Sequence, residues 1–128
     1  MHIKVTAINE SGRLEWTIDG KKPKDSVIKL GKKTGSHRLD FKFADRTDLG
    51  LRFNRDDPIW IDENEVGECP SPGVSTDQIR VESCTDKRLS LFNSNSGESR
   101  TLHYRLNFVD EQGNHADVDP VIKNGGNV

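Results

Sequence analysis

The sequence predicts an all-β protein, a sandwich of two sheets built from about eight or nine short strands. Apolar residues alternate with polar ones in short runs, as they do in half-buried strands. These runs follow one another at intervals of about 8–12 residues, and no stretch carries the apolar stripe of a helix. Apolar residues make up only 31% of the chain and charged residues another 31%. This composition is typical of a thin core between two sheets whose outer faces are exposed to solvent.

The clearest element is a hairpin near the C-terminus. Its first strand places four apolar side chains on one face: Leu102, Tyr104, Leu106 and Phe108. The turn 110–113 begins with Asp and ends with Gly, as type I turns do, and an extended run over 114–122 returns from it. We expect the four side chains to point inward, and Val118 and Ile122 to cover the same core.

The polar face of that first strand carries His103, Arg105 and Asn107, and we expect it to face solvent. Two interpretations of Tyr104 are open. It is either an ordinary core tyrosine or a tyrosine corner whose hydroxyl bonds to upstream backbone.

The rest of the chain supplies the other strands. We expect them over 2–9, 14–18, 27–30, 39–43, 51–53, 79–81 and 89–91. The consecutive apolar residues 59–61 are either buried on both sides or cross between the sheets. Residues 63–77 have no periodicity and form the longest loop, a length that is often functional. The strand spacing favours an immunoglobulin-like sandwich with Greek-key elements, a single domain over 1–124 followed by a flexible tail, 125–128.

Charge and composition bear on partners and location. The net charge is −2 and the only basic cluster is 21–24, so we expect no nucleic-acid partner. No apolar run is long enough to span a membrane, and residues 1–12 lack the apolar core of a signal peptide, so we expect a cytoplasmic protein that is a monomer or weak dimer. Two cysteines, Cys69 and Cys84, are too few for a disulfide scaffold and are expected to be free thiols.

The C-terminal hairpin also resembles a known group of proteins. The segments FVDEQGN and VDPVIKNGG are similar to the ends of small bacterial proteins of immunoglobulin-like build, and more loosely to the DP-EP family. The resemblance covers residues 108–126, with an Asp-Pro pair at 57–58, and no Glu-Pro pair occurs in the chain. It implies a β-sandwich and no particular activity.

No motif in the sequence points to catalysis. The four histidines have neither helical spacing nor a nearby Cys or His partner, so no metal site and no cofactor is expected. The chain lacks a Gly-x-Ser-x-Gly elbow, and Cys84 has no histidine beside it. We therefore expect a protein that is not an enzyme. A hydrolase with a dispersed site is the weakest of three hypotheses.

Acidic loops around one tryptophan are the best candidates for a binding site. The carboxylates crowd two adjacent loops: Asp45, Asp48, Asp56, Asp57, Asp62, Glu63 and Glu65. Trp60 is expected on the face opposite its isoleucine neighbours, where an exposed indole would be a binding anchor. The sequence therefore predicts a non-enzymatic binding or structural module, most simply one that binds protein, through Trp60, Asp56, Asp57, Asp62 and Glu63. The alternative is a Ca²⁺- or carbohydrate-binding module that uses the same residues.

Overall fold

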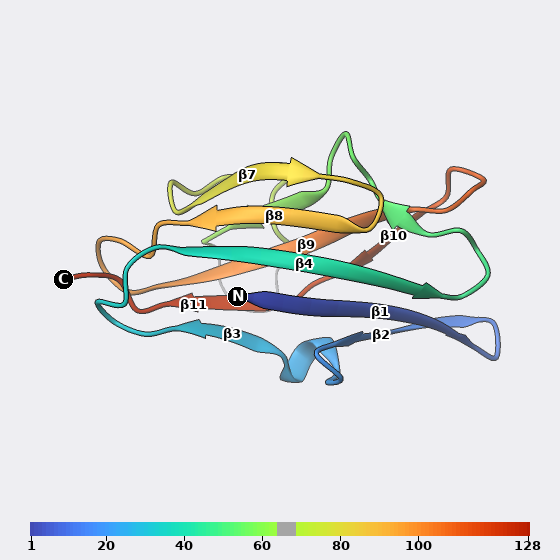
Figure 1. The fold of residues 1–128 in the computed structure, drawn as a ribbon, viewed down its shortest axis with the longest axis horizontal. Helices are drawn as coiled ribbons and strands as arrows, with labels where there is room; N and C mark the ends of the chain where they lie inside the picture. The colour runs from blue at the N-terminus through green and yellow to red at the C-terminus, as the bar shows by residue number, and fades with distance from the viewer. Residues whose placement is uncertain (64–68) are drawn as a thin grey trace.

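The protein is an all-β sandwich of two packed sheets, as the sequence predicts (Figure 1). The computed structural model describes residues 1–63 and 69–128. In this part of the chain the only helical element is a 3-10 turn, η1 at Pro23–Asp25. The same residues form eleven strands, more than the eight or nine expected. No helix among the described residues is long and apolar enough to cross a membrane.

The first sheet has five strands in the order β2-β1-β4-β8-β7. Their bounds are β1 His2–Glu10, β2 Arg13–Ile18, β4 His37–Arg46, β7 Ile79–Cys84 and β8 Arg88–Asn93. β1 runs parallel to β4, and the other pairs are antiparallel. Its inward side chains alternate with charged ones on the outer face, which accounts for the period-two pattern of the sequence.

The second sheet is organised around one long strand, β9. Its six strands are β3 Val27–Leu30, β5 Arg52–Phe53, β6 Ile59–Asp62, β9 Arg100–Val109, β10 His115–Val118 and β11 Val121–Asn124. β9 pairs with β5 and β6 on one side and with β10 and β11 on the other, and β11 runs parallel to β3. The run 114–122, expected as one strand, is interrupted at Pro120, which has no backbone N–H to donate. This division and the short strand β6 explain the larger number of strands.

The core lies between the sheets and confirms the predicted inward row of the hairpin. Leu102, Tyr104, Leu106, Phe108 and Ile122 are fully buried, and Val118 is 4% exposed. Aromatic rings form one end of the core: Trp16, Phe43, Phe53 and Phe108 stack with centroid separations between 4.5 and 6.0 Å. Trp16 is partly buried and packs against the core.

One expectation about β9 is wrong, and one of the two interpretations of Tyr104 is excluded. His103 and Asn107 were expected to face solvent, but they are only 5% and 4% exposed. The Asn107 side chain is held between Arg105, which donates to its Oδ1, and the Asp57 carbonyl, which accepts from its amide. Tyr104 is not a tyrosine corner, since its buried hydroxyl has no hydrogen-bond partner among the described residues. It is a core tyrosine, which was the other interpretation.

Residues 125–127, which the sequence predicts to belong to a flexible tail, form hydrogen bonds with other segments of the chain. Gly125 N–H donates to the Leu30 carbonyl at 2.8 Å, and Gly126 N–H donates to the Asn95 side chain at 2.9 Å. Asn127 N–H donates to the Gly97 carbonyl at 2.9 Å, and the Gly97 N–H returns a bond of 2.7 Å to Asn127 Oδ1. Glycine is needed at 126 because φ is +78° there and an added Cβ would lie 2.3 Å from the Gly97 carbonyl oxygen.

Candidate binding surface

The five predicted site residues lie in separate places. Trp60 and Asp57 line a small hollow on the outer face of the six-stranded sheet, and Asp56 lines an adjoining groove. Asp62 is buried, and Glu63 belongs to a polar network formed by several loops. Glu65 lies outside the described residues. The structure thus brings Trp60, Asp57 and Asp56 close to one surface and separates the other two from it.

The hollow is built around Trp60 and Arg105. The β6–β9 register sets these two residues opposite each other, and the Arg105 guanidinium carbon lies 4.1 Å from the centroid of the indole ring. The indole N–H donates to Asp57 Oδ2 at 2.8 Å. A cation over an aromatic face is attracted by the ring's negative centre, so each side chain holds the other in place.

Further contacts fix Arg105 in this position. Its Nε donates to Asn107 Oδ1 at 2.8 Å, and the Asn107 amide donates to the Asp57 carbonyl at 2.9 Å. The other end of the guanidinium is 3.4 Å from Asp117 and 3.9 Å from the Cys69 sulfur. These contacts leave a preformed hollow of about 330 Å³ lined by half-buried Trp60 and Arg105.

The adjoining groove joins the edges of the two sheets. It has a volume of about 980 Å³ and collects groups of both charges: Arg52, Arg55, Asp56, Asp86 and His115. Cys84 also lines it, and partial burial raises the pKa of its thiol, an effect that Asp86 reinforces and Arg55 opposes. A raised pKa keeps this sulfur protonated at neutral pH, which is the opposite of what a cysteine nucleophile requires. Asn54 and His115 line both the hollow and the groove, so the two form one continuous surface.

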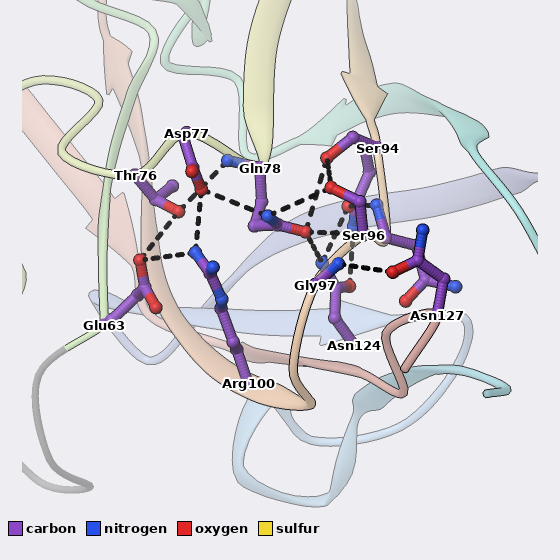
Figure 2. Close-up of polar contacts among 12 residues, drawn as sticks. Glu63, Thr76, Asp77, Gln78, Ser94, Ser96, Gly97, Arg100, Asn124 and Asn127 are labelled. Atoms are coloured by element: carbon purple, nitrogen blue, oxygen red, sulfur yellow. Dashed lines mark hydrogen bonds and ion pairs between the residues drawn. The ribbon is translucent and has the colours of Figure 1, made fainter. Parts of the chain in front are cut away.

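Glu63 has a structural position at one end of the sandwich. Figure 2 shows Gln78 at the centre of a network that reaches Glu63 through Asp77 and Arg100. Arg100 lies 2.7 Å from Asp77 and 3.4 Å from Glu63, and Thr76 donates to Glu63 at 3.1 Å. The hydrogen bond from Gln78 and the charge of Arg100 hold the pKa of Asp77 below its usual range.

The other half of this network fixes the loop after β8. The Gln78 side-chain oxygen accepts from Ser94, from the Ser96 N–H and from Asn124, at 3.3, 3.0 and 3.3 Å. Every polar side chain labelled in Figure 2 has a partner inside the protein. The arrangement is therefore suited to holding loops rather than to binding a ligand.

The acidic loops do not converge on a cation position. Asp62 is 4% exposed and accepts the Ser71 N–H at 2.6 Å. Asp45 accepts the backbone N–H groups of Thr47 and Leu51, each at 2.9 Å, and thereby shapes its own loop. Across residues 1–63 and 69–128 no three His, Cys, Asp or Glu side chains gather as a metal site would need.

Comparison of the chain with models of protein families gives no match, and comparison with curated proteins gives none either. The resemblance of residues 108–126 to the DP-EP family therefore stays a prediction.

Sequence reasoning missed the residues that complete the surface. Arg105 was placed on a face expected to be solvent, and Arg52, Arg55 and His115 were not singled out. Trp60 meets Arg105 only through the pairing of β6 with β9, a register between segments more than 40 residues apart that no local pattern encodes. A hint existed in the alternation of β9, which puts Arg105 on the face opposite the core.

Proposed function

We propose that this protein is a non-enzymatic binding module that recognises a partner protein through the surface formed by the hollow and the groove, called here the Trp60 surface. Its central residues are Trp60, Arg105, Asp57, Asp56 and His115. The observation that carries the proposal is the Trp60–Arg105 stack, a preformed pair of the two residue types that most often dominate protein interfaces. Because both side chains are already held in position, binding costs little side-chain ordering.

The geometry favours this function over the two alternatives. Carbohydrate recognition by Trp60 would need an open indole face, and Arg105 covers one of them. Ca²⁺ binding would need convergent carboxylates, whereas Asp56, Asp57 and Asp62 are directed to separate places. A hydrolase would need an activated nucleophile, and the thiol in the groove has a raised pKa.

The same proposal includes the fold family of the module and its location in the cell. The packing of two sheets into a sandwich and the C-terminal resemblance support an immunoglobulin-like sandwich related to the DP-EP family. Unpaired Cys69 and Cys84 support a reducing compartment, and so a cytoplasmic protein.

Quantitative capture from cell extract tests the function. Wild-type protein and the variants Trp60→Ala and Arg105→Ala are immobilised, and bound proteins are compared by mass spectrometry. Lys123→Ala, an exposed cation on β11, serves as the matched control. We expect both surface variants to lose the same partner and the control to keep it. With that partner purified, Trp60→Ala or Arg105→Ala should raise the dissociation constant at least about tenfold.

The variants must first melt cooperatively, close to the wild-type temperature, so that lost binding is not lost folding. The proposal is wrong if wild type, Trp60→Ala and Arg105→Ala capture the same proteins in the same amounts.

A further inference from the structure

Three cationic side chains lie side by side on the outer face of the five-stranded sheet, on the side of the sandwich away from Trp60. They are called here the basic row: Lys4, Lys42 and Arg88. The β1–β4 register sets Lys4 opposite Lys42, and the β4–β8 register sets Lys42 opposite Arg88. Their strand neighbours Ile3, Phe41 and Leu89 are buried, so the three cations project outward. Since neighbouring strands lie about 4.8 Å apart, this basic row spans about 10 Å.

No acid within the described chain neutralises the basic row. None of its three members forms an ion pair with a carboxylate in residues 1–63 or 69–128. The nearest acid along β4, Asp40, is already engaged by Arg38 at 3.1 Å and by the Ser90 hydroxyl at 2.6 Å. Like charges directly opposite each other destabilise a sheet, so an external anion would relieve a repulsion that the free protein carries.

The basic row lies in a shallow depression that offers further donors. The depression has a volume of about 890 Å³, and the hydroxyl residues Ser83, Thr85 and Ser90 line it together with the cations. Two acids, Asp19 and Asp40, also line it, and Asp19 accepts the Lys4 backbone N–H at 2.8 Å. Among the described residues of the lining, the only Phe, Tyr or Trp is the buried Phe41, and His2 adds an exposed imidazole, so the surface offers mainly charge and hydrogen bonding.

We propose that the basic row docks a short acidic segment of a partner protein. Three cations across about 10 Å match two or three neighbouring carboxylates, whose oxygens also accept from the flanking hydroxyls. A nucleic acid or an anionic membrane spreads its charge much further, and would meet Asp19, Asp40 and a chain whose net charge is −2. The basic row shares no residue with the lining of the Trp60 surface, and its occupancy does not depend on the function proposed above.

A labelled peptide titration tests the proposal on the full-length protein. The probe is a fluorescent ten-residue peptide with three consecutive glutamates flanked by glycine and serine, and the same peptide with glutamines is its neutral counterpart. The row variant is Lys4→Ser/Lys42→Ser/Arg88→Ser. The control variant, Lys24→Ser/Lys29→Ser/Lys123→Ser, removes three exposed cations from other parts of the surface.

At low ionic strength we expect the acidic peptide to bind wild type and the control variant, and the neutral peptide to bind neither. The row variant should bind the acidic peptide about tenfold more weakly, because three exposed ion pairs each contribute modestly. Added salt should weaken the binding to wild type. If the triple variant does not melt cooperatively, Lys42→Glu alone supplies the comparison and should show the same direction.

The other outcomes overturn the proposal. Absence of binding by the acidic peptide to wild type at millimolar concentration rejects the site. Equal loss in the row and control variants shows general attraction by surface charge. Tighter, row-dependent binding of a DNA duplex or of vesicles containing phosphatidylserine rejects an acidic protein segment as the occupant.

Discussion

Asn93 and Asn124 exchange two hydrogen bonds, the side-chain amide of each donating to the side-chain oxygen of the other at 2.8 Å. Asn93 ends β8 in one sheet and Asn124 ends β11 in the other, and neither is more than 2% exposed. A buried amide is costly unless its donors and acceptors are paired, and here each residue supplies the partner that the other needs. The pair therefore joins the two sheets at one end of the sandwich.

Asn124→Ala should lower the free energy of unfolding by about 2–3 kcal/mol, because it leaves the buried side-chain amide of Asn93 without its acceptor. Urea denaturation monitored by circular dichroism measures the change. Asn9→Ala, at an exposed position of β1, is the control and should change stability by less than about 0.5 kcal/mol. Equal changes in the free energy of unfolding for Asn124→Ala and Asn9→Ala would mean that the Asn93–Asn124 pair does not stabilise the fold.

Gly126→Ala tests the fixed C-terminal segment. Its Cβ would meet the Gly97 carbonyl oxygen at 2.3 Å in a backbone with φ of +78°. Gly20 has nearly the same φ, +80°, but open space around it. Gly20→Ala should cost about 1 kcal/mol for the left-handed backbone alone, and Gly126→Ala at least about 2 kcal/mol, since the clash adds to that strain. Equal losses of stability in Gly126→Ala and Gly20→Ala would support the flexible tail that the composition predicts.

Tyr104→Phe should leave the protein as stable or make it more stable by up to about 1 kcal/mol, because the buried hydroxyl that it removes has no partner in the described chain. A tyrosine corner would instead lose stability on this substitution. Thermal melting at neutral pH separates the two outcomes.

The same residue gives the stability a pH dependence. Complete burial raises the pKa of Tyr104 far above its usual value, so the folded protein keeps this proton at pH values where the unfolded chain has lost it. The free energy of unfolding should therefore be unaffected by this group below about pH 10 and should fall as the pH rises further. In Tyr104→Phe the free energy of unfolding should decrease less above about pH 10. The same pH dependence in wild type and Tyr104→Phe would contradict a raised pKa of Tyr104.

Lys42→Thr should raise the free energy of unfolding by about 0.5 kcal/mol at low ionic strength, because it removes the middle charge of the basic row and introduces a residue favoured in strands. The part of the gain due to charge should disappear in high salt. Arg13→Thr is a contrasting control, since Arg13 faces the opposite charge of Glu10 across the β1–β2 pair. It should show no salt-dependent gain, and a gain equal to that of Lys42→Thr would rule out the repulsion.

Local patterns predicted the strands well because alternation is a property of neighbouring residues. The inward row of β9 and the fold class followed from that alternation alone. What local patterns could not supply was the pairing of distant strands. The burial of His103, the stack of Arg105 on Trp60 and the anchoring of residues 125–127 all depend on segments that meet only in three dimensions.

The candidate site was predicted only in part for the same reason. The acidic residues around Trp60 lie close together in sequence, but alternate side chains of a strand point to opposite faces. In addition, Asp57 lines the hollow whereas its neighbour Asp56 lines the groove. Trp60 was singled out from its place in the sequence, while its contact with Arg105 depends on the register of β6 against β9.

The parallel pairing of β3 with β11 has a consequence for biosynthesis. Residues 27–30 leave the ribosome long before residues 121–124, and until β11 arrives β3 has no neighbour in the second sheet. A chain made at about 5–20 residues per second therefore exposes the apolar side of β3 for several seconds. The nascent protein should depend on chaperones during that interval, and a stalled chain ending before β11 should be a good substrate for proteases.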